Sequence, residues 1–163
     1  MCFLSPVVRC QPLSRALGLR LYMEIKEFSV CNLESLRKIY LHSRRDGFTW
    51  LKTDSFRLED FDRDTQGERI WLVEALGKVA GFISIWEPDK FVHHLYVSSE
   101  YQSQGIGSIL LNGAKAKYGY LSLKCMVQNQ KALEFYLSQG FAIVSQVDDE
   151  FGGYYHMSFS SKT

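Results

Sequence analysis

The spacing of apolar residues changes several times along the chain, and each change marks a predicted element. Between residues 24 and 159, stretches that alternate apolar and polar residues are interrupted by stretches with apolar residues three or four positions apart. Alternation is typical of strands, and the wider spacing is typical of helices. We therefore predict strands at residues 24–30, 70–75, 79–86, 91–97, 121–127, 142–147 and 154–159.

The helical spacing appears in three places. The first helix follows Asn32, which can cap a helix N-terminus, and it ends before residue 42. The second begins at Ile106 and ends near residue 119, and the third covers residues 131–139. The segment 42–67 is polar with scattered aromatic residues, which predicts a loop with a short helix.

The links between these elements constrain the topology. Between residues 70 and 97 the links are so short that three strands must form an antiparallel meander. The strand–helix–strand unit around Gly105 requires a parallel crossover pair. The predicted fold is mixed α/β: a mainly antiparallel sheet with a central parallel pair, flanked by helices.

Composition bounds the class of protein. The chain has 163 residues, 46% of them hydrophobic and 23% charged, with a formal net charge of +1. This is typical of a globular domain, and neither nucleic acid nor a membrane is expected as a partner. The four cysteines include no CxxC pair, so we expect no metal and a cytoplasmic location with reduced thiols. Residues 1–22 lack acidic residues and apolar periodicity, so they are predicted to be a disordered or loosely docked extension of a domain at 23–163.

The most informative segment joins the strand 91–97 to the helix that begins at Ile106. A Gly-x-Gly turn, Gly105 to Gly107, opens this helix directly after a polar loop. Glycines let a phosphate approach the backbone, and the first amides of a helix have no internal partners. Ser108 and Leu110 exclude a P-loop and a dinucleotide fingerprint, which require lysine and glycine respectively.

The run Gln102-Ser103-Gln104-Gly105-Ile106-Gly107 closely resembles the pyrophosphate-binding motif of the GCN5-related N-acetyltransferase (GNAT) superfamily. A second segment strengthens the resemblance. It contains Asn129, a tyrosine seven residues later at Tyr136, and a closing Gly140-Phe141. Asn129, Ala132 and Tyr136 share one helix face. The resemblance extends over residues 24–159.

The resemblance implies an acetyl-CoA-dependent N-acetyltransferase in which a primary amine of a small molecule or protein attacks acetyl-CoA directly in a ternary complex. It implies that Tyr136 is the general acid toward sulfur and that the Val97 amide faces the thioester. The implied cofactor-binding residues are Leu95, Tyr96, Val97, Gln102, Ser103, Gln104, Gly105, Ile106, Gly107, Ser108, Asn129, Ala132 and Tyr136.

Several residues are candidates for the general base that takes the proton from the amine. His93 and His94 are adjacent on a strand, so we expect them to point to opposite faces. The position of the base in several relatives selects His93, whose imidazole suits proton transfer near neutral pH. His94, Glu74 and Glu87 are weaker candidates, and water is another.

The resemblance implies that the amine substrate, which accepts the acetyl group, contacts residues 42–67 and 148–153. Phe48 and Trp50 could form an apolar wall there. Asp54, Glu59, Asp60 and Asp62 could attract a cation or form a solvated face. The alternative hypothesis is that the protein is not an enzyme but a non-catalytic acyl-CoA-binding module with the same fold. Because many members of the superfamily dimerise, a homodimer is also considered for this protein.

Overall fold

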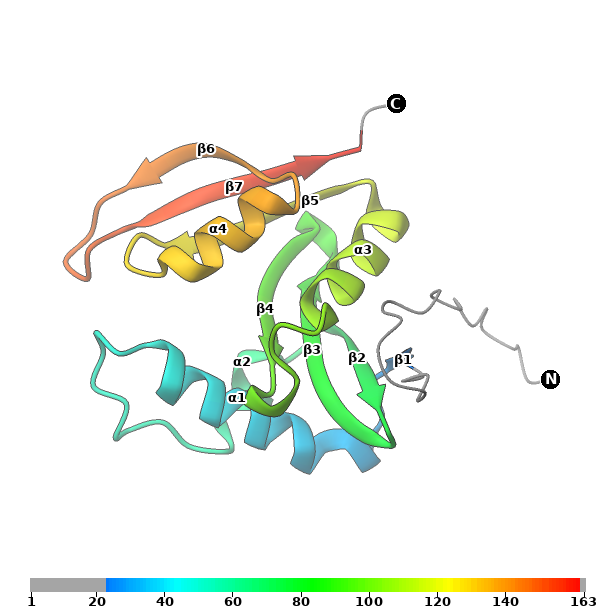
Figure 1. Ribbon diagram of the computed structural model, residues 1–163. Coiled ribbons are helices and arrows are strands. Elements are labelled where there is room, and N and C mark those ends of the chain that lie inside the picture. Colours follow the sequence, from blue (N-terminus) through cyan, green and yellow to red (C-terminus); the bar gives the residue numbers. More distant parts are fainter. Residues whose placement is uncertain (1–22, 162–163) are drawn as a thin grey trace.

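The computed structural model describes residues 23–161, so the predicted extension at 1–22 lies outside the described residues. The order of elements matches the prediction, with ends displaced by a few residues (Figure 1). The strands are β1 (Met23–Glu27), β2 (Arg69–Ala75), β3 (Lys78–Trp86), β4 (Phe91–Val97), β5 (Tyr120–Met126), β6 (Ala142–Val147) and β7 (Tyr154–Ser160). The helices are α1 (Leu33–Gly47), α2 (Asp60–Asp64), α3 (Ile106–Tyr118) and α4 (Gln130–Ser138), with short 3-10 turns η1 (Val30–Asn32), η2 (Glu87–Asp89) and η3 (Ser99–Tyr101).

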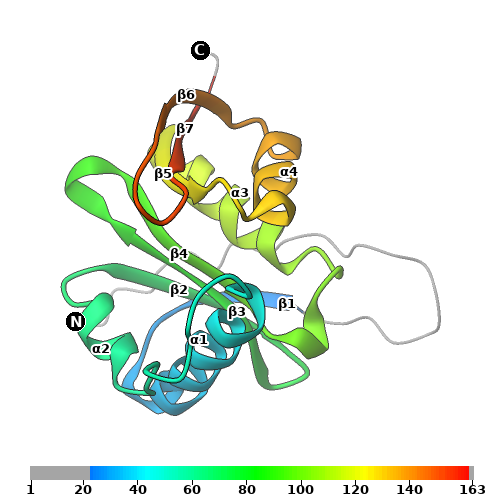
Figure 2. The same ribbon diagram turned by 90° about the vertical axis from the view of Figure 1, so that its left-hand side faces the viewer.

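The seven strands form one sheet in the order β1-β2-β3-β4-β5-β7-β6. Neighbouring strands are antiparallel except for β4 and β5, which are parallel. The helices α3 and α4 lie on one face of this sheet and α1 and α2 on the other (Figures 1 and 2). The predicted mixed α/β architecture with a central parallel pair is therefore confirmed.

A hydrophobic core lies on each face of the sheet. On the α3 face, Leu110 packs in a cluster with strand residues such as Ile83 and Leu123. On the α1 face, Leu36 packs in a separate cluster that includes Leu72 and Phe82. Removing this apolar surface from water stabilises both layers, so the sheet is held rigidly between them.

The parallel pair is short. Its register contains only the pairs Phe91–Ser122 and Val92–Leu123. Beyond Val92 the two strands diverge, and β4 continues to Val97 with only β3 as its neighbour. The divergence splits the centre of the sheet, and the backbone of β4 that faces the split has no strand partner.

Three details of the prediction are wrong. The first strand ends at Glu27, and the side chain of Asn32 does not cap α1. The helix α1 also continues through residues 42–47, where a loop was expected. Arg44 explains why the pattern did not predict this extension. It occupies a core position of the helix, where its guanidinium packs 3.9 Å from the centroid of the Tyr40 ring and donates to Asp60 at 2.9 Å. A buried arginine at a core position hides the helical spacing of apolar residues.

Candidate active site

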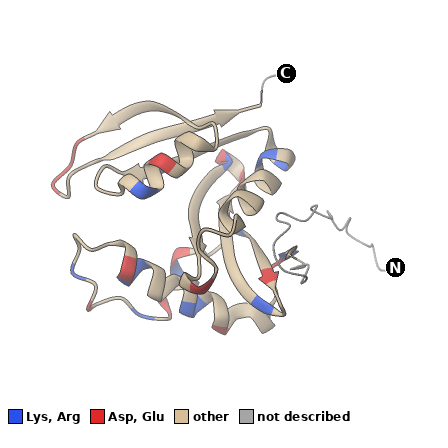
Figure 3. Ribbon diagram, viewed as in Figure 1, with Lys and Arg blue, Asp and Glu red and all other residues tan. Residues whose placement is uncertain are grey.

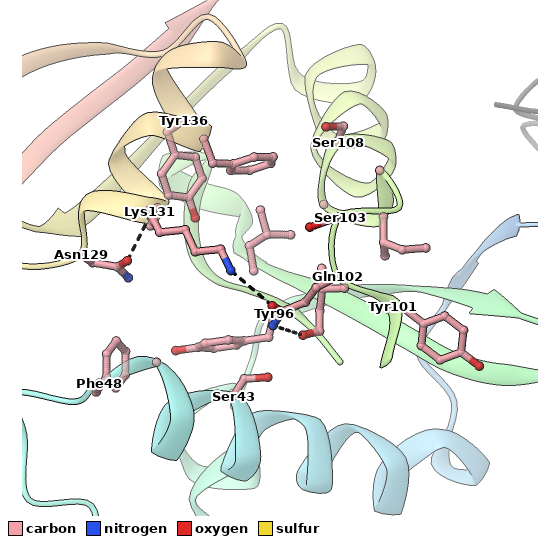
Figure 4. A pocket seen from close by; sticks show the side chains of 18 residues that line it. Ser43, Phe48, Tyr96, Tyr101, Gln102, Ser103, Ser108, Asn129, Lys131 and Tyr136 are labelled. Carbon is pink, nitrogen blue, oxygen red and sulfur yellow. Dashed lines mark hydrogen bonds between the residues drawn. The ribbon is translucent and has the colours of Figure 1, made fainter. Parts of the chain in front are cut away.

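A cavity of about 490 Å³ occupies the split between β4 and β5. Its walls come from the C-terminal half of β4, the turn that opens α3, one face of α4 and the end of α1 (Figure 4). The lining residues are Ser43, Gly47, Phe48, Leu95, Tyr96, Val97, Tyr101, Gln102, Ser103, Gly105, Ile106, Gly107, Ser108, Asn129, Lys131, Ala132, Phe135 and Tyr136. The sequence-predicted cofactor residues are thus brought together, with Gln104 as the exception. The Gln104 side chain donates instead to the Glu100 carbonyl at 3.1 Å.

The glycine turn presents main-chain amides to this cavity. Gly105 is the N-cap of α3 with φ at 83°, a left-handed conformation that costs glycine little. Ser103 also has a positive φ, of 61°. No side chain caps α3, and its first intrahelical bond runs from Ile109 N to Gly105 O at 3.0 Å. The amides of residues 106–108 therefore have no partner within the helix, and these residues line the cavity, an arrangement that suits an anion such as a diphosphate.

The helix α4 forms the opposite wall and begins at Asn129. Asn129 is the N-cap of α4, and its side chain accepts from the Ala132 amide at 3.1 Å. Lys131, in the first turn, donates to Gln102 Oε1 at 3.3 Å and so bridges the cavity mouth (Figure 4). Lys131 is the one charged residue that lines the cavity among the described residues, and the sequence reasoning missed it.

Tyr136 lies on the same helix face, and its hydroxyl points into the cavity (Figure 4). Its ring packs edge-on against Phe135 and Phe141, with centroids 5.4 and 5.7 Å away. Burial, with smaller contributions from Cys125 and Tyr96, raises the pKa of this phenol above its ordinary value. The hydroxyl is therefore protonated at neutral pH, and it is available as a proton donor.

Tyr96 enters the cavity from the α1 face of β4. Its ring stacks on His94, with centroids 6.1 Å apart, and meets Tyr40 edge-on at 5.6 Å. Burial raises the pKa of Tyr96 to about 12 and lowers that of His94 to about 4. His94 is thus neutral, and it does not line the cavity.

His93 also lies outside the cavity lining. It is the extra residue of a β-bulge, because Ser84 pairs with His94 and Ile85 pairs with Val92. The bulge breaks the alternation of side chains, and the two histidine rings lie only 6.0 Å apart. The expectation that His93 and His94 point to opposite faces is therefore wrong.

The two segments expected to contact an acceptor lie on the same side of the molecule, with the acidic β6–β7 turn facing the α1–α2 link (Figures 1 and 3). Phe48 lines the main cavity, whereas Trp50 lines an adjoining cavity of about 540 Å³. Asp60 and Asp62 pair with Arg44 and Arg37, so both carboxylates already have cationic partners within the fold.

Four further cavity residues were not singled out from the sequence: Ser43, Gly47, Tyr101 and Phe135. Phe135 occupies its place because residue 107 is a glycine. A Cβ atom there would lie 3.2 Å from the end of the Phe135 ring. The glycine turn thus serves packing between α3 and α4 as well as the exposure of amides.

The sequence of residues 33–141 matches the pattern of the "Acetyltransferase (GNAT) family". The chain belongs to this family. A curated relative from Escherichia coli strain K12, the peptidyl-lysine N-acetyltransferase YiaC, is 30% identical over 123 residues, which cover 74% of this chain and 84% of YiaC.

Solved structures share the GNAT fold. The solution structure of apo YjaB from Escherichia coli superimposes with a TM-score of 0.71 at 19% identity, and covers 86% of this chain and 99% of YjaB. The PaiA N-acetyltransferase of Thermoplasma acidophilum, in complex with coenzyme A, gives 0.69 at 20% identity and covers 85% and 98%. Among residues 23–161 no helix is long and apolar enough to cross a bilayer, and no group of three or more His, Cys, Asp or Glu residues is arranged to hold a metal ion.

Proposed function

We propose that this protein transfers the acetyl group of acetyl-CoA to the ε-amine of lysine in proteins or peptides, by direct attack in a ternary complex. The observation that carries the proposal is the cavity in the split, where free helix amides and the Tyr136 hydroxyl line one space. Lysine is chosen as the acceptor because the relative YiaC, 30% identical to this chain, is a peptidyl-lysine N-acetyltransferase.

In this proposal the turn from Gln102 to Ser108 holds the diphosphate through main-chain amides, with Lys131 contributing a positive charge. The free edge of β4 from Leu95 to Val97 pairs with the amide groups of the pantetheine arm. Asn129 and Ala132 contact the same arm from α4. Acetyl-CoA is a substrate here, and its thioester supplies the activated acetyl group.

The reaction then requires proton transfers at both the nitrogen and the sulfur. A lysine amine with a reference pKa of about 10.4 must lose a proton, at a cost of about 4.6 kcal/mol at pH 7. The neutral nitrogen attacks the thioester carbon, a C–N bond forms, and the C–S bond breaks. Tyr136 donates its proton to the departing sulfur, and the Val97 amide stabilises the developing oxyanion.

The test is to incubate the purified protein with acetyl-CoA and a panel of lysine peptides, N-terminal peptides and polyamines. Thiol release and the mass of the product are measured together. We expect acetylation of the lysine side chain in the peptides. Binding of acetyl-CoA without thiol release, in wild type and Tyr136→Phe alike, would instead identify a non-catalytic acyl-CoA-binding module. Exclusive acetylation of polyamines or N-terminal amines would refute the lysine acceptor.

A further inference from the structure

A buried carboxylate lies beside the split on the face opposite α3. Glu68 directly precedes β2, and its side chain is only 2% exposed. Its Oε1 contacts Nδ1 of His93, while Oε2 is buried without a hydrogen-bond partner among the described residues. A buried carboxylate is costly unless it is paired, so this residue needs an explanation that packing does not provide.

His93 occupies a particular place relative to the split. It immediately follows Val92, the last residue of β4 that pairs with β5. The part of β4 that lines the cavity begins two residues further along, at Leu95. Leu95 and Val97 pack with the α3-face core and Tyr96 with the α1-face core, so the cavity is lined from both faces of the sheet. His93 therefore lies between the closed end of the split and the stretch of β4 that lines the cavity.

We propose that Glu68 is a positioning residue for His93: it holds the imidazole with its proton on Nδ1, so that Nε2 accepts the proton of the attacking amine. The role in turnover rests on the proposed acetyl transfer. In this proposal Glu68 is ionised, so it can only accept a hydrogen bond, and Nδ1 of His93 is the donor. The neutral ring then carries its lone pair on Nε2. His93 is 42% exposed, so its ring is accessible to an amine or to a bridging water.

Burial and a nearby cation favour the neutral form of this ring. Burial, followed by the positive charge of Lys124 on β5, lowers the pKa of His93 below its ordinary value. Glu68 faces the ring from the segment before β2, and the His94 ring lies beside it on β4. His156 on β7 is the register partner of Lys124. His94 cannot substitute as the base, since its ring packs against Tyr40 and Tyr96 and desolvation lowers its pKa to about 4.

The transfer balances without another reactant. The amine proton passes to Nε2 and gives an imidazolium, stabilised by Glu68 through Nδ1–H. After the nitrogen attacks, it loses its second proton to solvent as the amide forms. Tyr136 gives its proton to sulfur as the C–S bond breaks and is reprotonated from solvent, and the imidazolium returns its proton to solvent. The products are the N-acetylated amine, free coenzyme A and the proton released from the ammonium group.

The first experiment does not depend on acetyl transfer by the protein. Nitrogen NMR of the wild-type imidazole is expected to show the proton of neutral His93 on Nδ1, and Glu68→Gln is expected to lower the pKa of His93 by about 1 unit through loss of the adjacent charge. An Nε2–H tautomer in the wild type, or an unchanged pKa in the variant, would overturn the positioning role. This readout stands even if no amine is acetylated, so failure of the proposed function is distinguished from failure of the inference.

The second experiment measures pH–rate profiles of Glu68→Gln, His93→Ala and the double variant. In Glu68→Gln we expect kcat/KM to fall about 10- to 100-fold with an unchanged Kd for acetyl-CoA. The acid limb of its kcat/KM profile should also move to lower pH, because the reaction requires a neutral His93 imidazole and the pKa of His93 falls in this variant. Adding Glu68→Gln to His93→Ala should cost nothing further. An equal loss in both backgrounds would show that Glu68 acts without His93.

The matched control is Glu27→Gln, which removes a carboxylate from β1 that contacts Arg69 rather than a histidine. We expect its profile to be that of the wild type, and thermal denaturation shows whether each variant is folded. The conservative change Glu68→Asp retains the charge, so its acid limb should lie closer to that of the wild type than the limb of Glu68→Gln. If both Glu68 variants shift equally, the charge is not what matters and the proposal fails.

Discussion

The two sides of the split between β4 and β5 differ in how many segments of the chain supply their residues. On the α3 face, the cavity is lined by one continuous turn, which opens α3 without a side-chain cap. On the α1 face, Glu68, His93 and Lys124 come from three separate segments. The first arrangement suits a fixed ligand such as a diphosphate. The second can change with the acceptor while the first is retained.

The largest effect is expected on the α3 face. Gly105→Asp places a negative charge within about 4 Å of the diphosphate, which costs about 4 kcal/mol, or nearly three orders of magnitude in acetyl-CoA affinity. Calorimetric titration measures this loss. Gly105→Ala is the matched variant, because it introduces only the strain of a side chain at a φ of 83° and should cost about 1–2 kcal/mol. Full affinity in Gly105→Asp would place the diphosphate elsewhere.

Tyr136→Phe separates chemistry from binding on the same face. Removing the proton donor should lower kcat about 100-fold while the Kd for acetyl-CoA changes little, since the ring and its packing remain. Stopped-flow measurement of thiol release gives kcat. Tyr120→Phe is the control, because this tyrosine is exposed on β5 outside the cavity. Similar kcat values for both variants would remove the assigned role of Tyr136.

Asn129 also stabilises the helix that holds Tyr136, and this contribution to stability is smaller. Asn129→Ala removes the side-chain bond to the Ala132 amide and should lower the free energy of unfolding by about 1 kcal/mol. Urea denaturation monitored by circular dichroism measures it. Asn129→Ser retains a capping oxygen and should recover most of the loss. If serine and alanine destabilise the protein equally, the cap does not stabilise α4.

The smallest effect is expected on the α1 face. The Lys124 charge lowers the pKa of His93, so Lys124→Met should raise that pKa, and the acid limb of kcat/KM should move to higher pH by about half a unit. The sign is opposite to that of Glu68→Gln. A pH–rate profile at low and high salt measures it, since salt screens an exposed pair. A shift to lower pH would contradict the arrangement of charges around His93.

The α3 face could be predicted from the sequence because its elements are local. The strand, the glycine turn and the helix that follows are contiguous, so spacing alone places the amides from Gly105 to Ser108. Tyr136 follows Asn129 by seven residues on a capped helix, so its face could also be derived. By contrast, Glu68 and His93 are 25 residues apart, and the sequence holds no signal that their side chains meet.

The sequence by itself determined the order of elements, the mixed sheet and the position of the glycine turn, because hydrophobic periodicity and helix-end chemistry act over a few neighbouring residues. Only the tertiary structure decided where the split begins, that a bulge turns His93 away from its alternating position, and that a buried carboxylate faces it. Strand register and burial depend on contacts between distant segments, and a shift of one residue redirects a side chain without altering the pattern that specifies the strand.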